Sequence, residues 1–259
     1  MYKTIVLEIS DNKATITLNR PEVYNAFNTE MSFELQGAIK EVAKNKAVRV
    51  LVITGAGKAF CSGQDLKEVQ AAGQRSLMDS VQQRYNPLIR AMRNLPKPII
   101  CRLNGIAAGA GCSLALACDM IIASEEAALL EAFVNIGLVL DSGSSFFLPR
   151  LTGMARAFEL ATTGRKITAR EALQYGLVNQ VVPADELDKA VGERVAYYAS
   201  APTKAIGLIK KLLNQSFHSD LDTMLEAEAC YQEIAGRSKD YKEGVAAFLE
   251  KRKPRFTGE

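Results

Sequence analysis

Residues 96–124 read PKPIICRLNGIAAGAGCSLALACDMIIAS and contain two mostly apolar runs separated by a turn rich in glycine and alanine. These runs, residues 98–105 and 119–124, are typical of strands that are buried on both faces of a parallel sheet. Between them, residues 109–118 predict a tight turn that opens a short buried helix. A strand, a helix and a second strand in this order predict an α/β fold.

The chain before this stretch repeats the pattern. Two alternating segments joined by the polar turn SDNK predict a hairpin, and the apolar run VRVLVITG predicts a buried strand. Apolar residues three or four apart predict an amphipathic helix with Asn28 or Thr29 as its cap. The expected elements are strands at residues 4–9 and 13–19, a helix at 28–45, a strand at 48–55 and a helical region at about 66–94.

The last third of the chain is mostly helical in pattern. Thr168 and Glu171 form a capping box, Gly176 is a plausible helix stop, and GLVNQVVP predicts a last strand. The remaining segments are amphipathic helices, and their apolar stripes need a surface to cover. We therefore expect a core at residues 1–197 and a helical oligomerisation region at residues 198–259, which docks on the core or on a neighbouring subunit.

The composition narrows the classes of function. The chain has 259 residues with 48% hydrophobic content, and its net charge of +3 is too small and dispersed for a nucleic-acid binder. No apolar run approaches the ~20 residues of a membrane span, and no signal-peptide pattern is visible, so we expect a cytoplasmic protein. Five cysteines without C-x-x-C spacing predict reduced thiols and no structural zinc. The single histidine, His218, excludes zinc hydrolases and disfavours a Ser-His-Asp triad.

Two turns of small residues can each present unpaired backbone amides. A phosphate-binding P-loop is excluded at TGAGKAF, because Lys58 is followed by alanine. Residues 105–115 lack the glycine order of a dinucleotide site, so they predict either close packing at a tight turn or amides that stabilise an anion. Residues 58–68 hold a second such turn, where Ser62 or Asp65 could simply cap a helix. Two amides that converge on one carbonyl oxygen would form an oxyanion hole.

Five segments carry a family resemblance: LNRPEVYNAFN, GAGKAFCSGQDLKE, PKPIICRLNGIAAGAGCSLALACDMIIAS, NIGLVLDSGSSFFLPRLTG and ALQYGLVNQVV. In this order and at these separations they resemble the enoyl-CoA hydratase/isomerase (crotonase) family, and the match covers essentially the whole chain. The resemblance implies a ClpP-like α/β spiral of strand-strand-helix units with a C-terminal helical trimerisation region. It also implies an acyl-CoA substrate and assembly as a homotrimer or a homohexamer made of two trimers.

The resemblance also assigns the site. The family's two oxyanion donors are backbone amides that match Gln64 and Ala110, and they would hold the thioester carbonyl of an acyl-CoA as it becomes an enolate. The resemblance implies no metal or redox cofactor. The coenzyme A moiety is part of the substrate. The positions that match the family's coenzyme A contacts are Val23, Ser62, Gln64, Asp65 and Leu66, with Phe248 and Lys251 near the adenine end, often from a neighbouring subunit.

Two departures set this chain apart from the hydratases of the family. Those enzymes use two glutamates to activate water, and the matching residues here, Ser113 and Phe133, cannot act as general bases.

Asp141 instead falls where isomerases and some aromatic-acyl members carry an acid. By local chemistry it is a good cap for the following helix, and by resemblance it is a proton carrier, and the two roles can coexist. Burial among apolar neighbours is expected to raise its pKa. Those neighbours are Leu138, Val139, Leu140 and Phe146.

Glu131 is a second carboxylate candidate. Strand alternation places it on the same face as Phe133, so it would line the cavity if that face does. The competing interpretation is a charge at a strand end, or an ion pair with Arg150 or Arg156. Leu140 replaces the proline that this family usually carries before the acid, which can shift the turn at Asp141.

We therefore expect an acyl-CoA isomerase that shifts a double bond, or rearranges a ring epoxide of an (aryl)acyl-CoA, through an enolate. Motifs such as YNPL, AAGAG and LPR resemble most the isomerases of aromatic acyl-CoA catabolism. The rivals are a hydratase that uses Asp141 or Glu131, a non-catalytic or RNA-binding member, and a peptidase suggested by the shared spiral core. The modest charge argues against RNA, and the lone His218 argues against a peptidase. A lid over the acyl pocket is expected within residues 66–86.

Overall fold

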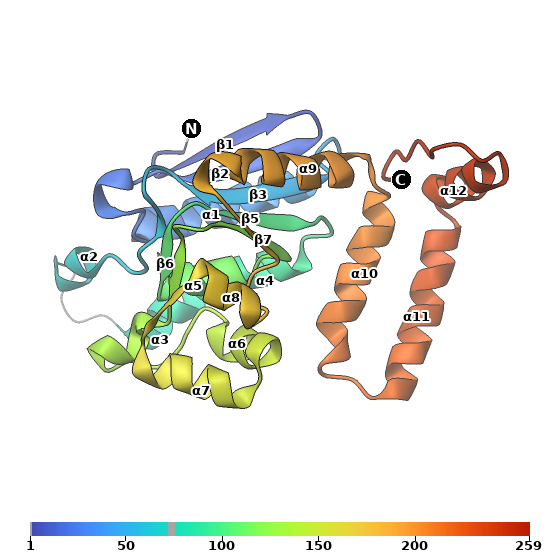
Figure 1. The fold of residues 1–259 in the computed structure, drawn as a ribbon. Helices are drawn as coiled ribbons and strands as arrows, with labels where there is room; N and C mark the ends of the chain where they lie inside the picture. The colour runs from blue at the N-terminus through green and yellow to red at the C-terminus, as the bar shows by residue number, and fades with distance from the viewer. Residues whose placement is uncertain (1, 72–75) are drawn as a thin grey trace.

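The computed structural model describes residues 2–71 and 76–259 and contains two sheets (Figure 1). The larger sheet has the strand order β1-β2-β3-β5-β7-β10, and the smaller has the order β4-β6-β8-β9. The strands are β1 (Ile5–Ser10), β2 (Lys13–Leu18), β3 (Val50–Gly55), β4 (Ala59–Cys61), β5 (Ile99–Leu103), β6 (Ile106–Ala108), β7 (Met120–Ser124), β8 (Ala128–Leu130), β9 (Lys166–Thr168) and β10 (Gln180–Val182).

Helices follow the strands along the chain. They are α1 (Thr29–Lys44), α2 (Leu66–Ala71), α3 (Leu77–Ser80), α4 (Asn86–Asn94), α5 (Ala110–Leu116), α6 (Ser144–Thr152), α7 (Met154–Thr163), α8 (Ala169–Gln174), α9 (Leu187–Ser200), α10 (Thr203–Ser216), α11 (Leu221–Gly236) and α12 (Lys239–Leu249). The shorter segments are the 3₁₀ turns η1 (Pro21–Val23), η3 (Ala132–Ile136) and η4 (Ala184–Glu186), and the π-helical segment η2 (Val81–Tyr85). The expected helical region and lid therefore hold several short helices, and their residues 72–75 lie outside the described parts of the chain.

The N-terminal hairpin forms as predicted. β1 and β2 pair antiparallel, whereas β2, β3, β5, β7 and β10 pair in parallel along the larger sheet. Asp11 and Asn12 at the tip have φ values of 49° and 63°, and this left-handed geometry suits a two-residue turn that matches the twist of the strands. Asn28 caps α1 by accepting a hydrogen bond from the Met31 amide at 2.8 Å, which confirms one of the two expected caps.

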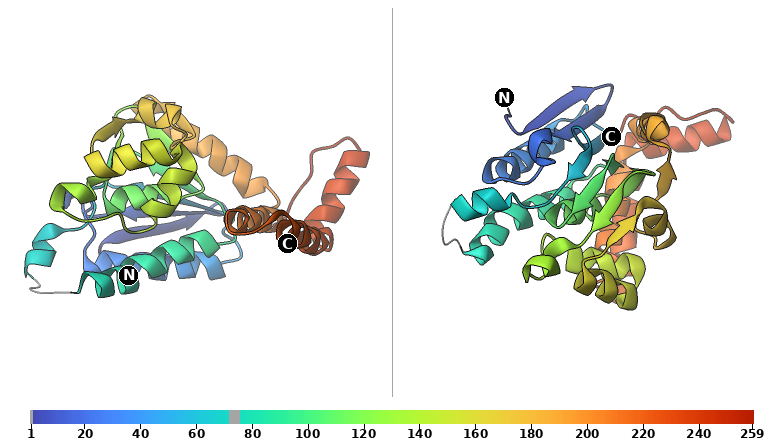
Figure 2. Two further views of the ribbon diagram at one scale, coloured as in Figure 1. Left: turned by 90° about the horizontal axis from the view of Figure 1, so that it is seen from below. Right: turned by 60° about the vertical axis from the view of Figure 1, so that its left-hand side comes forward.

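The central strand β3 is buried along its whole length because both faces of the larger sheet are covered. Leu51 and Ile53 belong to the main core cluster, together with residues of α1 and α4, while Val50 and Val52 belong to a second cluster under α9. Successive side chains of a strand point to opposite faces, so a strand covered on both sides must be apolar at every position. Figure 2 shows α1 and α9 on opposite sides of the sheet.

The two sheets are linked by a repeated unit. β4, β6 and β8 of the smaller sheet each follow β3, β5 and β7 of the larger sheet in the chain, and helical segments follow each pair. β4 pairs with β6 and β6 with β8, both in parallel, so each turn of the chain stacks on the one before. The expected spiral of strand-strand-helix units is confirmed.

The C-terminal helices extend away from this core (Figures 1 and 2). The boundary expected after residue 197 falls inside α9, which packs on β3, β5 and β7, and α10 is the first helix to leave the sheet. The buried Arg49 side chain ties the region back to the core, since it donates to the Thr203 hydroxyl at 2.9 Å and to the carbonyl oxygen of Phe256 at 3.0 Å. α11 buries none of its residues within the chain.

Two further observations concern the chain as a whole. Within residues 2–71 and 76–259, no helix is long and apolar enough to cross a membrane. All five cysteines are free thiols, and four of them are buried, with Cys230 exposed. The expectation that the thiols are mostly buried is confirmed.

Candidate active site

Two turns meet at one edge of the smaller sheet. β4 and β6 are parallel neighbours, so the turns that follow them, at Gly63 and Gly109, lie at the same edge. A Cβ atom at Gly63 would lie 2.8 Å from the carbonyl oxygen of Ala108 and 3.6 Å from the amide nitrogen of Ala110. Gly63 also has a φ of 93°, which side chains rarely allow. Glycine at this position is what lets the second turn approach the first.

The amides of Gln64 and Ala110 are available to a ligand at this junction. Within the described residues, neither N–H group donates a hydrogen bond, although the neighbouring backbone is paired. The Phe27 amide donates to the Gly63 carbonyl at 2.7 Å, and the Asp65 amide donates to the Phe27 carbonyl at 2.8 Å. Ala110 opens α5, where the first N–H groups have no partner inside the helix. The structure brings these two sequence-predicted amides together.

Tyr85 is a contact that the sequence analysis missed. Its hydroxyl donates a short hydrogen bond to Oε1 of Gln64, and its ring packs edge to face against Phe27 with centroids 5.5 Å apart. Burial raises the pKa of the Tyr85 phenol, and the charge of Asp141 raises it further. The phenol and the Asp141 carboxylate therefore share the region next to Gln64. The π-helical turn that places Tyr85 there has no signal in the sequence, beyond the position of Tyr85 in the YNPL motif.

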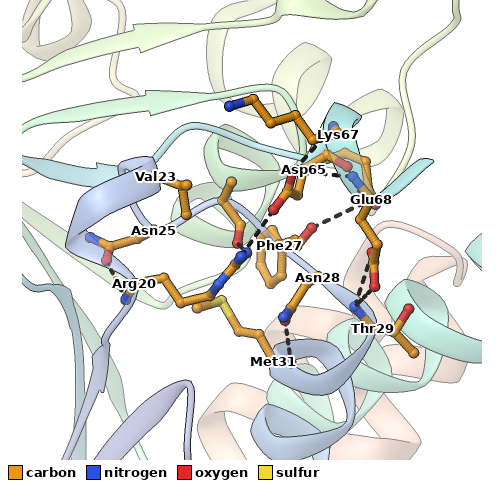
Figure 3. Close-up of polar contacts among 12 residues, drawn as sticks. Arg20, Val23, Asn25, Phe27, Asn28, Thr29, Met31, Asp65, Lys67 and Glu68 are labelled. Carbon is orange, nitrogen blue, oxygen red and sulfur yellow. Dashed lines mark hydrogen bonds and ion pairs between the residues drawn. The ribbon is translucent and has the colours of Figure 1, made fainter. Parts of the chain in front are cut away.

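The turn after β4 is held by the Asp65 carboxylate (Figure 3). Its Oδ2 atom accepts a hydrogen bond from Arg20 at 3.0 Å, and its Oδ1 atom accepts from the amides of Lys67 and Glu68 at 3.2 and 3.4 Å. Asp65 therefore caps α2, as one of the two interpretations of this turn predicted. The Arg20 partner and these hydrogen bonds lower the pKa of Asp65 despite burial, so it stays charged.

The residues matched to the coenzyme A contacts lie in two separate places. Ser62 does not cap α2, because its hydroxyl donates to the Val23 carbonyl at 3.2 Å and so joins the two expected contact segments. Leu66 begins α2 directly after them and is exposed. Phe248 (83% exposed) and Lys251 lie instead at the end of α12, at the opposite end of the molecule from α2 in all views (Figures 1 and 2). Within one chain these two groups are not brought together.

Asp141 lies in the loop between η3 and α6. Its expected capping role is wrong, because the cap position of α6 is Gly143 and no side chain bonds there. Its Oδ1 atom instead accepts a hydrogen bond from the Ser142 hydroxyl at 2.8 Å. Burial raises the pKa of Asp141, and the Ser142 hydrogen bond opposes that shift. Ser142 adopts a φ of 51°, a strained geometry for a residue other than glycine.

The apolar shell expected around Asp141 is partly wrong. Leu138 is 38% exposed and Val139 is 85% exposed, so neither forms part of a buried shell. Leu140 and Phe146 are half-buried. The Asp141 pKa is raised as expected, and the cause is the expected one, burial.

Glu131 is buried, with 4% of its surface exposed, where β8 ends. Oε1 accepts a hydrogen bond from the Ser144 hydroxyl at 2.8 Å, and Oε2 has no hydrogen-bond partner within residues 2–71 and 76–259. Burial raises the pKa of Glu131 to about 7. The expected ion pair with Arg150 or Arg156 is wrong, because the Arg150 guanidinium lies over the Phe146 ring and that of Arg156 over the Tyr175 ring. The expected strand alternation is also wrong, because the chain leaves β8 after Leu130 and enters the 3₁₀ turn η3.

The two positions where hydratases would carry glutamates are filled by a hydroxyl and a ring. Ser113 is fully buried in α5, and its hydroxyl lies 2.7 Å from the Ser144 hydroxyl and 3.1 Å from the carbonyl oxygen of Asp141. Phe133 is buried, and a Cβ atom at Gly109 would lie 4.0 Å from its ring. Phe133 thus presents an apolar ring near the first turn of α5, close to the Ala110 amide.

This arrangement places two free amides near the Asp141 carboxylate, whose pKa is raised, and a second carboxylate of raised pKa, Glu131, lies buried behind the Asp141 loop. The family model for enoyl-CoA hydratase/isomerase matches residues 8–259. The chain belongs to the enoyl-CoA hydratase/isomerase family. It is therefore an enzyme of this family, and the resemblance inferred from the motifs is confirmed.

Relatives in the enoyl-CoA hydratase/isomerase family carry several names. The chain is 44% identical to a 1,2-epoxyphenylacetyl-CoA isomerase of Escherichia coli (strain K12) over 261 residues, which covers 100% of both chains. It is also 44% identical to a probable enoyl-CoA hydratase of Rhodobacter capsulatus, over 99% of both chains. A trans-2-decenoyl-[acyl-carrier-protein] isomerase of Streptococcus mutans is 36% identical over 99% of both chains.

Solved structures of the enoyl-CoA hydratase/isomerase family share the fold. A putative enoyl-CoA hydratase from Streptomyces coelicolor A3(2) superposes with a TM-score of 0.95 at 34% identity, covering 100% of this chain and 96% of that one. A putative enoyl-CoA hydratase/isomerase from Mycobacterium abscessus superposes with a TM-score of 0.93 at 37% identity, covering 98% and 100%. The crotonase spiral is thus the fold of this chain.

Proposed function

We propose that the protein is an acyl-CoA isomerase that shifts a double bond, or rearranges a ring epoxide of an (aryl)acyl-CoA, through a thioester enolate. The observation that carries the proposal is the position of Asp141. Its carboxylate has a raised pKa and its charge acts on Tyr85, which is bonded to the oxyanion residue Gln64. The residues at the two hydratase positions, Ser113 and Phe133, supply no base.

The proposed reaction follows from these groups. The thioester oxygen accepts hydrogen bonds from the Gln64 and Ala110 amides. The Asp141 carboxylate removes a proton from the carbon next to the thioester, and the electron pair of the C–H bond passes to the thioester oxygen as an enolate. The protonated Asp141 then returns the proton to the far carbon of the conjugated system, and the double bond moves. A raised pKa suits a group that must accept and release a proton near neutral pH.

The same proposal covers binding and assembly. The coenzyme A nucleotide would lie along Val23 and Ser62 to Leu66, and it is part of the substrate, so no resident cofactor is required. Because Phe248 and Lys251 lie at the far end of the chain, the adenine contact would come from a neighbouring subunit. Exposed apolar residues on the C-terminal helices support a homotrimer or a hexamer of two trimers. They include Ile209, Leu213, Leu221, Leu225 and Phe248.

Two substrates separate the isomerase from the rival hydratase. On addition of a 3-enoyl-CoA, an isomerase produces the conjugated 2-enoyl thioester, and its ultraviolet absorbance rises. On addition of crotonyl-CoA, a hydratase removes that absorbance, whereas the isomerase leaves it unchanged. Loss of crotonyl-CoA absorbance with no reaction of 3-enoyl or ring acyl-CoA substrates would contradict the proposal.

A further inference from the structure

A chain of three buried side chains from three different elements leads to the loop of Asp141. Glu131 stands at the end of β8, Ser144 is the first residue of α6, and Ser113 lies in α5. The Ser144 hydroxyl donates to Oε1 of Glu131 at 2.8 Å. The Ser113 and Ser144 hydroxyl oxygens are 2.7 Å apart. Both serines are fully buried, so water does not compete for these hydrogen bonds.

This chain of hydrogen bonds ends on the backbone carbonyl of Asp141, the proposed proton carrier. The carbonyl oxygen of Asp141 is 3.1 Å from the Ser113 hydroxyl and also accepts the Ser144 amide at 3.0 Å. The next residue, Ser142, has a φ of 51°, so the turn departs from relaxed geometry directly after this carbonyl. Such a conformation persists where surrounding contacts determine it, and the two serines supply those contacts.

The protonation state of Glu131 decides in which direction the two serine hydroxyl groups donate their hydrogen bonds. When Ser144 gives its proton to Oε1 of Glu131, its oxygen can accept the Ser113 proton. When Glu131 carries a proton on Oε1 and donates it to Ser144, Ser144 donates to Ser113, which leaves the Ser113 proton for the carbonyl of Asp141 at 3.1 Å or for the more distant carbonyl of Gly109 at 3.3 Å. A proton on Glu131 therefore favours a hydrogen bond to the carbonyl of residue 141.

Charged and titratable groups around Glu131 come from three neighbours. The Cys112 thiol lies beside it on α5, the Asp141 carboxylate acts on it from its loop, and Arg165 lines the same small cavity while paired with Glu159 and Glu171. Burial is the main cause of the raised pKa of Glu131, and the Asp141 charge adds to it.

Resting on the proposed function, we propose that Glu131 is a positioning residue. Through Ser144 and Ser113 it holds the peptide carbonyl of residue 141, and so it fixes the orientation of the Asp141 side chain. Glu131 itself does not touch the substrate. It acts on Asp141 by way of two hydroxyl groups, and this role is distinct from that of the water-activating glutamates of hydratases, whose positions are filled here by Ser113 and Phe133.

Deuterium exchange into an acyl-CoA substrate, measured with the assembled enzyme, tests this role. Glu131→Met and Ser144→Ala each remove one link and are expected to lower kcat at least tenfold, with KM within twofold of wild type. Because both break the same chain, the double variant should be no slower than the slower single variant. Glu131→Gln keeps a group that can donate to Ser144, as a protonated Glu131 does, and should recover at least threefold over Glu131→Met. Ser145→Ala, which removes an exposed hydroxyl on the same helix turn, is the matched control.

Losses that multiply in the double variant, or a failure of Glu131→Gln to exceed Glu131→Met, would overturn the proposal. A second measurement uses no substrate and separates it from a failure of the proposed function. In a pH titration of the wild type, the ¹³C chemical shift of the Asp141 carboxyl should show two steps. One reports Asp141 itself, and the second, near pH 7, reports the titration of Glu131. That step should vanish in Glu131→Gln and fall by at least half in Ser144→Ala. An unchanged step in both variants would overturn the positioning role even for an enzyme with another reaction.

Discussion

The hydroxyl of Tyr85 donates a hydrogen bond to the side-chain oxygen of Gln64, the residue whose backbone amide forms half of the proposed oxyanion hole. The side-chain nitrogen of Gln64 in turn donates to the Phe27 carbonyl at 3.0 Å, and the Phe27 and Tyr85 rings pack against each other. Gln64 is thus fixed through its side chain as well as its backbone. An amide that stabilises a developing negative charge acts best when it is held in place before the reaction.

Tyr85→Phe tests this support. The variant keeps the ring and its contact with Phe27 but removes the hydrogen bond to Gln64, which is worth about 1 kcal/mol. We expect kcat for proton exchange to fall about fivefold to tenfold while the midpoint of thermal unfolding changes little. Tyr2→Phe is the matched control, because Tyr2 makes the same kind of hydrogen bond to Glu41, away from the site. Equal kcat values for both variants would contradict the role of Tyr85.

Ala110→Pro removes the second proposed donor. Proline has no N–H group and is tolerated in the first turn of a helix, where Ala110 lies. Loss of one oxyanion donor costs about 10²–10³ in kcat. Ala110→Gly keeps the N–H group and serves as the control. Steady-state kinetics measure kcat of both variants, and circular dichroism checks that they fold. A folded Ala110→Pro variant as active as Ala110→Gly would contradict the proposed oxyanion hole.

Gly63→Ala should harm both stability and activity. The new Cβ atom would lie 2.8 Å from the Ala108 carbonyl oxygen, on a backbone with a φ of 93°. We expect a loss of about 1–3 kcal/mol in the free energy of unfolding and a larger relative loss of exchange activity, because the Gln64 amide moves. At Gly192 in α9 a Cβ atom meets nothing within 4 Å, so Gly192→Ala should stabilise by up to about 1 kcal/mol. Denaturant titration of both variants compares them.

The pH dependence of stability reports on Glu131. Its pKa of about 7 lies above the ordinary value of 4.5, so the folded chain holds this proton more tightly than the unfolded chain. The resulting stabilisation is fully present below about pH 4.5 and is lost as the pH rises through 7. Wild type should therefore lose about 3 kcal/mol more than Glu131→Gln between pH 4.5 and pH 8.

Urea titrations across this range give the comparison. The exposed residue Glu193 supplies the control variant Glu193→Gln, which should follow the wild-type curve. Parallel curves for wild type and Glu131→Gln would show that Glu131 is ionised at neutral pH.

The sequence predicted those features that local patterns encode. The apolar run at β3 and the Asn28 cap appear in the structure, and Thr168 caps α8 by accepting a hydrogen bond from the Glu171 amide at 3.2 Å. Only this half of the expected capping box forms, because the Glu171 carboxylate bonds Arg165 and Tyr175 instead. The two turns with unpaired amides were located because glycine at residue 63 and the small residues near 109 are required by backbone geometry that tolerates little else.

Features that depend on contacts between distant segments could not be predicted. Asp141 follows the local rule for a helix cap, but its carboxylate bonds Ser142 and no cap bond forms. Glu131 was assigned to a strand face, whereas the chain turns at this residue and its partner is Ser144. The link from Tyr85 to Gln64 spans 21 residues and depends on how η2 packs. Periodicity and propensity carry no information on such pairs.

The central claim is that Asp141 carries the proton of the reaction. Mass spectrometry of deuterium incorporation into a panel of unsaturated straight-chain and ring acyl-CoA thioesters compares wild type with Asp141→Asn, which keeps the shape of the side chain. We expect that wild type exchanges at least one of these substrates and that the variant loses about 100-fold or more of the rate, as expected for a general acid–base group, while it still binds acyl-CoA. Full exchange by Asp141→Asn would contradict the central claim.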